Sequence, residues 1–464
     1  MIKEVMKVNE NIFRAYDLRG IYGEELDDNG AYYIGVAFGL HIKNEGKRVA
    51  IVGHDNRVSS PAISENLING ITDTGIDVID IGLAMTPMFS YAREYLNIPS
   101  GIMITASHSP SAYNGMKVYF NEEGRIYGDI IQAFKEEAKS VLNNFTPTVS
   151  KGSIKTSDMR EPYIEMIKDK IKLGNRKIKV VIDCGNGSGS IIAKEVYESV
   201  GCEVVPLFCD SDPAFPNHHP DPAVEENMVA LKQKVIEVHA DLGVGFDGDA
   251  DRVGVVDEQG HMIYMDLYTA IICRDLLPRL TDKKVLIDIK CSKALEDEVV
   301  KLGGEPVYSR TGHSYMIKAM KQNNIVFGCE LAGHAYFADE FYGYDDGPYA
   351  GLRLIRILSN TDKPVSALLD GINKYYATPE IIVKATDDTK FNIVNDVITY
   401  TKEKGYNILT IDGVRVLFND GWSLVRASNT GPNLTMRFEA ISEERLAEIK
   451  QEFEQVLENV MNKY

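Results

Sequence analysis

Three aspartates separated by small residues form the most distinctive chemical feature of the sequence. They are Asp247, Asp249 and Asp251, in the segment GVGFDGDADRVGVVDEQG at residues 243–260. A period of two can turn the three carboxylates to one side of an extended chain, and three oxygen donors suit a hard divalent cation. We expect Mg²⁺ rather than Zn²⁺, because no histidine or cysteine is interleaved. Carboxylates so close together repel one another unless a cation or Arg252 neutralises them.

Two other interpretations of this segment have to be weighed. An acidic turn in an acidic protein would need no ligand. A calcium-binding EF-hand loop would use Glu258, the twelfth residue counting from Asp247, but it requires glycine at position six and a helix on each side. Position six is Arg252 and the flanking residues are typical of strands, so we exclude the EF-hand.

A short apolar segment leads into a loop of hydroxyl and imidazole side chains in GIMITASHSPSAYNGMKVY, residues 101–119. The Ser107 hydroxyl is a weak nucleophile that needs a base or a metal to activate it. His108 is adjacent, and Lys117 follows ten residues later. The combination favours nucleophilic catalysis. The alternative is a polar loop whose hydroxyls cap the next helix.

Three short motifs in the second half of the chain contain further candidate side chains. Lys290 lies in DIKCS, and Gly312 and His313 lie in TGHS. In CELAGH, Glu330 and His334 flank small residues, and a carboxylate with an imidazole can bind vicinal hydroxyls. Each motif is weak in isolation, since a lone lysine or histidine in such a place is more often structural.

The segment VRASNTGPNLTMRFEA, residues 425–440, has the composition of an anion site. A guanidinium, two hydroxyls, an amide and a flexible backbone fall within six residues: Arg426, Ser428, Asn429, Thr430 and Gly431. Charge-assisted donors combined with exposed backbone N–H groups are a common way to hold a phosphate. A hairpin turn rich in serine, asparagine and glycine would account for the same residues without a ligand.

Repeated strand–turn–helix patterns must position these loops. Apolar, β-branched segments beginning near Val49, Val180 and Val285 each end in a polar turn, and a helical pattern follows. Such segments are typical of strands buried on both faces of a sheet. The first of these helices is predicted to start with Ser60 as its N-cap and Pro61 at its first position. The pattern predicts three similar α/β domains.

The C-terminal residues follow a different pattern. Two segments, VRVLFNDGWSLVRAS and LTMRFEA, are typical of hairpin strands. Ser442 is predicted to cap a helix whose apolar face is formed by Leu446, Ile449, Phe453, Val456 and Val460. We therefore predict the α/β class, with three similar α/β domains and a smaller α+β C-terminal domain. The expected domains are 1–150 with the Ser107 loop, 151–258 with the metal-binding loop, 259–374 with the sugar-binding loop, and 375–464 with the phosphate-binding loop.

Composition excludes several classes of protein. With 464 residues, 44% hydrophobic and 25% charged, the chain is typical of a globular protein of about three or four domains. Its net charge of −18 argues against nucleic acid or an anionic membrane as partner, so an anionic substrate needs locally gathered cations. We find no apolar segment long enough for a membrane span and no signal peptide. The six cysteines contain no CxxC pair and are too sparse for a disulfide framework, which predicts a reducing, cytoplasmic location.

Taken together, the motifs resemble those of the α-D-phosphohexomutase superfamily, most closely its phosphomannomutase/phosphoglucomutase branch. The resemblance runs from IFRAYDLRG through TASHSP, DGDADR, DIKCS, TGHS and CELAGH to RASNTGP, in the family's order and over almost the whole chain. It implies four domains around a deep central cleft, each contributing one loop. It also implies reversible phosphoryl transfer between O1 and O6 of a hexose phosphate, mannose and/or glucose, through a phosphoserine and a hexose 1,6-bisphosphate intermediate.

The resemblance assigns roles residue by residue. Ser107 would be the phosphoserine, and it would bind Mg²⁺ together with Asp247, Asp249 and Asp251. Lys117 and Arg19 would take part in proton transfer, and His313 is a further acid–base candidate. The residues implied at the catalytic end are Tyr16, Arg19, His108, Lys117 and Arg252. Those implied at the sugar are Lys290, Gly312, His313, Glu330, Ala332 and His334, and those implied at the non-reacting phosphate are Arg426, Ser428, Asn429, Thr430 and Gly431.

Two positions depart from the family's commonest pattern. Ser109 stands where many members carry asparagine, which changes little. Ala332 stands where serine is usual, which removes one hydrogen bond to the sugar. The sequence therefore leaves open whether mannose, glucose or another sugar, such as a pentose or an amino sugar, is preferred. The resemblance further implies hexose 1,6-bisphosphate as activator, and a monomer or homodimer without a nucleic acid or membrane partner.

Two rival hypotheses share the same residues. The DGD motif also fits a phosphomutase or phosphatase that acts through an aspartyl phosphate on Asp247. Alternatively, the chain is a non-catalytic protein that binds sugar phosphates. The presence of Ser107, of all three aspartates and of Lys117 argues against a loss of catalysis. Hydroxylamine separates the two covalent mechanisms, because it cleaves an acyl phosphate and leaves phosphoserine intact.

Overall fold

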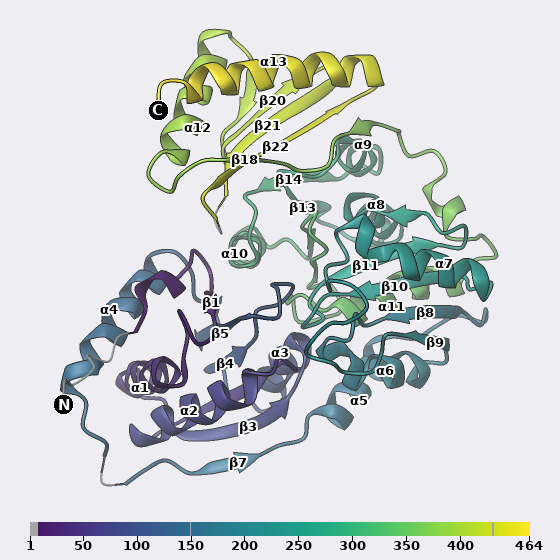
Figure 1. Ribbon diagram of the computed structural model, residues 1–464. Coiled ribbons are helices and arrows are strands. Elements are labelled where there is room, and N and C mark those ends of the chain that lie inside the picture. Colours follow the sequence, from purple (N-terminus) through teal and green to yellow (C-terminus); the bar gives the residue numbers. More distant parts are fainter. Residues whose placement is uncertain (1–7, 149, 429–430) are drawn as a thin grey trace. The chain divides into compact units, whose positions relative to one another are not determined.

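The computed structural model describes residues 8–148, 150–428 and 431–464 (Figure 1). These residues form two compact units. The first contains the described residues up to Tyr264 together with Ala332–Leu368, and the second contains Met265–Leu331 and Leu369–Tyr464. None of the helices in these ranges combines the length and the apolar character that a membrane crossing requires.

The first sheet of the first unit has a parallel centre and an antiparallel edge. Strand β2 (Val49–His54) pairs in parallel with β3 (Asp77–Leu83) and with β4 (Gly101–Ile104). Strand β5 (Tyr113–Asn121) runs antiparallel to β4 and to β1 (Leu18–Ile21). The buried central residues of β2 confirm the predicted strand at Val49. The sheet is completed by β6 (Gly124–Arg125) and β7 (Ile154–Thr156).

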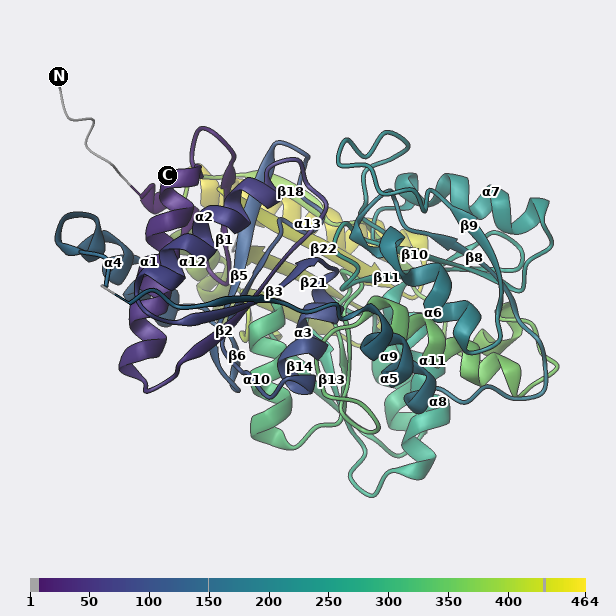
Figure 2. The ribbon, with the colours of Figure 1, turned by 90° about the horizontal axis from the view of Figure 1, so that it is seen from below.

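Helices α1 (Asp28–Asn44) and α2 (Ser60–Asp73) lie side by side in both Figure 1 and Figure 2. Glycines let their backbones touch. A Cβ atom at Gly35 would lie 2.2 Å from the Leu67 carbonyl oxygen, and one at Gly70 would lie 2.1 Å from the Tyr32 carbonyl oxygen. Any larger residue at either position would push the two helices apart. Both helices contribute to a single apolar core with the first sheet.

The start of α2 differs from the prediction by one residue. The N-cap is Ser59 rather than Ser60, and it makes no side-chain capping hydrogen bond. Ser60 instead donates to the buried Asp55 carboxylate at 2.5 Å. Pro61 accordingly lies at the second helical position rather than the first, still within the first turn. The physical reason is burial: a buried carboxylate needs a donor, and the Ser60 hydroxyl supplies one.

The second sheet of the first unit places the acidic segment. Strand β8 (Lys179–Asp183) lies between β9 (Glu203–Leu207) and β10 (Leu242–Phe246), parallel to both. Strand β11 (Val253–Asp257) returns antiparallel to β10 and pairs with β12 (Met262–Ile263). The three aspartates therefore occupy the connection between two buried strands. The other regular elements of this unit are α3 (Thr86–Tyr95), α4 (Asp129–Asn144), α5 (Arg160–Lys170), α6 (Ala193–Ser199), α7 (Val229–Glu237), β16 (Ala335–Phe337) and α11 (Gly347–Ser359).

The second unit begins with a parallel arrangement of the same kind. Strand β13 (Lys284–Asp288) pairs in parallel with β14 (Glu305–Ser309) and with β15 (Phe327–Cys329). The predicted strand at Val285 is thereby confirmed. The helices of this part are α8 (Met265–Leu276), α9 (Lys293–Lys301) and α10 (His313–Asn323). Short 3₁₀ helices in the described part of the chain span Glu10–Ile12, Ser188–Ile191, Glu225–Met228, Leu277–Arg279 and Ser366–Leu369.

The C-terminal part of the second unit is an antiparallel sheet that shares one core with two helices. Ser442 caps the last helix as predicted, since its side chain accepts a hydrogen bond from the Arg445 backbone N–H at 3.2 Å. Ile449, Phe453 and Val460 on the predicted apolar face are buried. The sheets of the described residues thus match three α/β domains and a smaller C-terminal α+β domain. The elements are β17 (Tyr376–Ala377), β18 (Ile381–Lys384), α12 (Lys390–Glu403), β19 (Asn407–Leu409), β20 (Val414–Phe418), β21 (Gly421–Ala427), β22 (Asn433–Ala440) and α13 (Glu443–Met461).

Candidate active site

The three aspartates of the β10–β11 connection converge on one point. Carboxylate oxygens of Asp247, Asp249 and Asp251 lie within 4.8 Å of one another, and all three side chains are buried. The sequence predicted this convergence from strand alternation, and that reason was wrong. The three residues lie outside β10 and β11, in a turn whose Ala250 has a left-handed backbone with φ of 58°. The turn, rather than a pleat, brings the carboxylates together.

Ser107 lies against this acidic turn. Its hydroxyl donates to Asp247 Oδ2 at 2.6 Å, and His108 Nδ1 lies 3.2 Å from the same hydroxyl oxygen. The serine has a left-handed backbone with φ of 49°, a conformation that costs a non-glycine residue free energy and has to be held by its surroundings. A Cβ atom at Gly248 would lie 2.4 Å from the Ser107 carbonyl oxygen, so the two loops touch through their backbones.

Arg57 holds the serine loop in this strained shape. Its buried guanidinium donates to the carbonyl oxygens of Ser107 and Ser109 at 2.7 Å each, and to those of Pro110 and Tyr113 at 2.8 and 3.1 Å. The Asp55 carboxylate accepts from Arg57 Nε at 3.2 Å. The sequence analysis did not identify this arginine. The sequence feature that could have predicted it is its place in the polar turn after β2, two residues after Asp55.

Lys117 neutralises part of the acidic turn. From β5, its Nζ atom lies 2.5 Å from a carboxylate oxygen of Asp249 and 2.5 Å from one of Asp251, and 3.1 Å from Thr86 Oγ1. Burial alone would lower the pKa of Lys117, but the carboxylates of Asp249 and Asp251 together raise it above its usual range. The ammonium group is therefore charged at neutral pH and lies between two of the candidate metal ligands.

The aspartates differ in electrostatic environment. Burial and the nearby carboxylates of Asp251 and Asp249 raise the pKa of Asp247 well above its usual range. Burial acts in the same direction on Asp251, yet Lys117 and His334 outweigh it and hold the pKa of that carboxyl well below its usual range.

The donor set of the turn fits a hard divalent cation. Among the described residues, Asp249 Oδ1 is buried and has no hydrogen-bond partner. A buried carboxylate oxygen without a donor is costly, and a bound cation removes that cost. Oxygen ligands alone favour Mg²⁺ or a similar ion over zinc. Asp247, Asp249 and Asp251 can therefore hold a metal ion beside the Ser107 hydroxyl.

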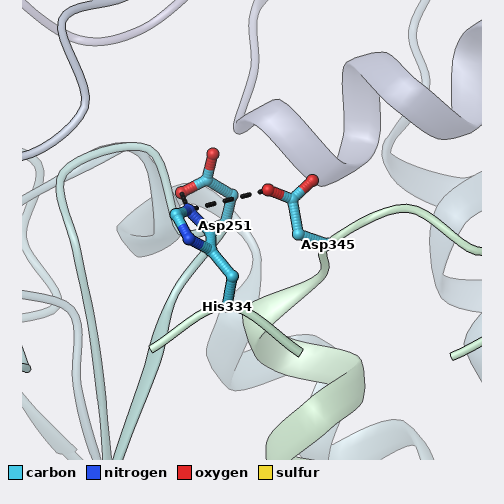
Figure 3. Close-up of side chains that lie close together, drawn as sticks. All are labelled: Asp251, His334 and Asp345. Atoms are coloured by element: carbon cyan, nitrogen blue, oxygen red, sulfur yellow. Dashed lines mark ion pairs between the residues drawn. The ribbon is translucent and has the colours of Figure 1, made fainter. Parts of the chain in front are cut away.

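His334 joins the acidic turn from a distant part of the chain. Its Nε2 atom lies 3.3 Å from Asp251 Oδ1 and 3.7 Å from Asp345 Oδ2. Figure 3 shows the imidazole close to Asp251, with the Asp345 carboxylate across from it. Asp345, which directly precedes the N-cap of α11, is a second residue that the sequence analysis did not identify. The sequence feature that indicates Asp345 is the pair of consecutive aspartates before a helix.

Two predicted arginines of the first unit lie beside the serine loop and the acidic turn. Arg19 donates to Ser109 Oγ at 2.8 Å and to Asp17 at 2.5 Å. Arg252 lies 3.6 Å from Asp221 and 3.9 Å from Asp247. Burial, with the positive charges of Arg252 and Arg19, holds the pKa of His108 well below its usual range, so its imidazole is neutral at neutral pH. Tyr16 and Ala332 are half-buried.

A second group of predicted residues lies together within the second unit. Lys290 Nζ lies 2.6 Å from Glu380 and 3.8 Å from Asp288. The Gly312 backbone N–H donates to Glu330 Oε1 at 2.7 Å. The sequence patterns did not predict a role for Glu380. Nothing near Pro379 marks it as the partner of Lys290, which lies in a distant part of the chain.

Asp412 connects the sugar and phosphate motifs of this unit. One of its carboxylate oxygens accepts from Arg426 Nε at 2.9 Å and from the Thr311 backbone N–H at 3.1 Å. His313, the first residue of α10, is buried. Ser428 is buried at the end of β21, and the Gly431 carbonyl oxygen accepts from Lys390 at 3.1 Å. Asn429 and Thr430 lie outside the described residues.

Comparison with known proteins gives one consistent result. Four family models match in order: phosphoglucomutase/phosphomannomutase alpha/beta/alpha domain I at residues 10–144, domain II at 161–260, domain III at 265–375 and the C-terminal domain at 379–456. Together they match most of the chain.

Individual relatives match over nearly their full length. A phosphomannomutase/phosphoglucomutase of Pseudomonas putida is 40% identical over 447 residues, which cover 96% of this chain and 95% of the relative. A phosphoglucomutase of Neisseria gonorrhoeae is 37% identical over 454 residues, with 97% and 98% covered. A crystal structure of a phosphoglucomutase/phosphomannomutase family protein from Burkholderia thailandensis has a TM-score of 0.91 at 36% identity, with 98% of each chain covered.

Proposed function

The chain belongs to the phosphoglucomutase/phosphomannomutase family, and on that basis we propose that it transfers a phosphoryl group reversibly between O1 and O6 of a hexose phosphate. The observation that carries the proposal is the position of Ser107. Its hydroxyl lies 2.6 Å from Asp247, in a loop held by Arg57 and beside three carboxylates that can bind Mg²⁺. A hydroxyl at such a place can both receive and return a phosphoryl group.

Ser107 is the proposed phosphoryl donor in the first half-reaction, as phosphoserine, and the phosphoryl acceptor in the second. In the first, phospho-Ser107 gives its phosphoryl group to the free hydroxyl of a hexose monophosphate, which becomes a hexose 1,6-bisphosphate. In the second, the other phosphoryl group of this intermediate returns to Ser107. The bisphosphate has to turn end over end between the two steps, so two phosphate sites are needed. A bisphosphate supplied from solution would also serve as activator, by phosphorylating an empty serine.

Charge neutralisation is the main contribution of the groups around Ser107. Lys117 and Arg252 provide fixed positive charge beside the position of the phosphoryl group. A bound Mg²⁺ would supply electrostatic stabilisation of the phosphoryl oxygens. The neutral imidazole of His108 can exchange a hydrogen bond with the serine oxygen, and Arg19, through Ser109, orients the loop. We further propose Arg19 and Lys117 as proton-transfer groups.

The second unit is proposed to bind the rest of the substrate. The proposed sugar contacts are Lys290, Gly312, His313 and Glu330, with Tyr16, Ala332 and His334 from the first unit. The non-reacting phosphate would be held by Arg426, Ser428, Asn429, Thr430 and Gly431. The pairing of Arg426 with Asp412 supports this assignment, because it fixes the position of a guanidinium, a group that suits phosphate recognition, at the end of the loop.

Isotope labelling tests the covalent mechanism. The protein is incubated with glucose 1,6-bisphosphate carrying ³²P, and the labelled peptide is identified with and without hydroxylamine. We expect hydroxylamine-stable label on the peptide that contains Ser107. The matched control is Ser111→Ala, which removes an exposed hydroxyl of the same loop and should still be labelled.

Two results would overturn the mechanism. Hydroxylamine-labile label on Asp247 would establish an aspartyl phosphate instead. Binding of sugar phosphates without any label or interconversion, with Mg²⁺ and bisphosphate supplied, would favour a binding protein. Initial rates on mannose 1-phosphate, glucose 1-phosphate and ribose 1-phosphate then decide the preferred sugar.

A further inference from the structure

Two cysteine thiols meet at the carboxyl end of the second sheet, outside the proposed active site. Cys184 follows β8 and Cys209 follows β9, two neighbouring parallel strands in which Asp183 lies opposite Leu207. Phe208 has a left-handed backbone with φ of 49°, which turns the chain at this point. As a result the two Sγ atoms lie 3.2 Å apart.

The two thiols differ in exposure as a reactive pair requires. All six cysteines lie in the described part of the chain and are free, and Cys209 alone is partly exposed while Cys184 and the other four are buried. Contact with Cys184 is the largest of the effects that lower the pKa of Cys209 and raise its thiolate fraction. A thiolate that solvent reaches, with a second thiol in contact, is the arrangement of an attacking and a resolving cysteine.

The backbone already holds both cysteines in place. The Cys184 N–H donates to the Leu207 carbonyl oxygen at 3.2 Å, and the Asn186 N–H donates to the Phe208 carbonyl oxygen at 2.9 Å. The Asn186 side chain donates to the Asp210 carbonyl oxygen at 2.8 Å. Closing the sulfur–sulfur distance from 3.2 Å to about 2.0 Å therefore needs a local shift of about 1.2 Å.

The same turn supports the proposed metal-binding loop. The Gly187 N–H donates to the Cys184 carbonyl oxygen at 2.8 Å, and the Ser188 N–H donates to the Gly248 carbonyl oxygen at 2.9 Å. The Ser188 hydroxyl donates to that same oxygen at 3.0 Å. A Cβ atom at Gly187 would lie 2.7 Å from the Gly248 carbonyl oxygen, so the backbones of the two loops are in close contact. Gly248 lies between Asp247 and Asp249, two of the proposed metal ligands.

We propose that Cys184 and Cys209 form a redox-active pair, which peroxides oxidise to a disulfide, and that this bond weakens divalent-cation binding by displacing the turn behind Gly248. The first part is independent of the proposed function. The second part rests on the proposed metal site.

The chemistry balances with a peroxide as the two-electron oxidant. The Cys209 thiolate attacks hydrogen peroxide, the O–O bond breaks, and after proton uptake the products are a sulfenic acid and water. The Cys184 thiol then attacks the sulfenic sulfur, its proton leaves with the hydroxyl group as a second water, and the S–S bond forms. Two thiols and one peroxide give one disulfide and two waters. A dithiol reductant reverses the change.

The full-length chain with intact thiols allows a direct test. Reduced protein is treated with one equivalent of hydrogen peroxide, remaining thiols are alkylated, and peptides are analysed without reduction. We expect a linked peptide pair that contains Cys184 and Cys209 and that dithiothreitol separates. Cys209→Ser should abolish the linked pair.

A second pair of cysteines provides the matched control. The Sγ atoms of Cys291 and Cys329 lie 4.0 Å apart in the second unit, and both thiols are buried. Cys329→Ser should leave the linkage between Cys184 and Cys209 unchanged. Alkylation of both Cys184 and Cys209 after peroxide treatment, or linkage of Cys291 to Cys329 at the same dose, would overturn the first part of the proposal.

Metal binding tests the second part without using enzyme activity. Mn²⁺ affinity is measured on reduced protein, on oxidised protein and on oxidised Cys209→Ser. Groups that support metal ligands typically change affinity by 10–100-fold, so we expect about a tenfold loss in the oxidised protein that dithiothreitol restores and that Cys209→Ser lacks. Equal affinity of the oxidised and reduced forms would overturn the coupling. Absence of Mn²⁺ binding in every form would instead contradict the proposed metal site.

Discussion

A buried carboxyl at the start of α11 should make the stability of the first unit depend on pH. Asp346 is the N-cap of this helix, and its Oδ1 atom accepts from the Tyr349 N–H at 2.8 Å and from the Tyr163 hydroxyl at 2.9 Å. Burial is the main cause that raises the pKa of Asp346 from 3.8 to about 7. We expect Asp346→Asn to remove this dependence, because asparagine keeps the accepting oxygen and carries no charge.

The size of the effect follows from linkage. A raised pKa means that the folded state holds a proton that the unfolded state has released, so the stability present below pH 3.8 is lost as pH rises toward about 7. Each unit of pH in this window costs about 1.4 kcal/mol. Between about pH 5 and about pH 8.5 the wild type should therefore lose roughly 2.7 kcal/mol relative to Asp346→Asn, because the loss ends near the folded pKa.

Urea unfolding followed by far-UV circular dichroism measures this difference. Tryptophan fluorescence is unsuitable, since the only tryptophan, Trp422, lies in the second unit. Asp27→Asn is the matched control, because Asp27 also caps a helix, with its side chain accepting from the Gly30 N–H, but is exposed and stays hydrated when folded. The two asparagine variants should differ in pH dependence. Parallel pH profiles of the wild type and Asp346→Asn would refute the reasoning.

Three further predictions concern the proposed site. Ser107→Ala should lower turnover by several orders of magnitude while leaving substrate affinity nearly unchanged; wild-type turnover in a steady-state assay would contradict the proposed nucleophile. Lys117→Met leaves Asp249 and Asp251 without their buried cation, so the metal-free unfolding free energy should fall by about 3–5 kcal/mol. Mg²⁺ should raise the unfolding free energy of this variant more than that of the wild type. Equal increases in urea titrations would argue against Mg²⁺ and the Lys117 ammonium occupying the same position. Arg426→Ala should weaken phosphosugars by roughly 1.5–3 kcal/mol in calorimetry, whereas an equal loss for unphosphorylated hexoses would show that the loop holds no phosphate.

The sequence alone determined the features that depend on neighbours in the chain. Apolar segments ending in polar turns predicted the strands at Val49, Val180 and Val285, and each forms with a neighbouring strand on both sides. The cap at Ser442 and the apolar face of α13 follow from spacing within one helix. The acidic residues of the β10–β11 connection, and the serine in its loop, were recognisable because the residue types themselves carry the chemistry.

Tertiary structure decided which of these groups touch. Lys117 meets aspartates more than a hundred positions later in the chain, and His334 reaches Asp251 from a separate segment. Even the local prediction at Ser60 was wrong, because the buried Asp55 takes its hydroxyl. Such pairings arise when burial removes water and every remaining charge or donor must find a partner. Local residue spacing does not predict these partners, because they depend on which surfaces the folded sheets bring together.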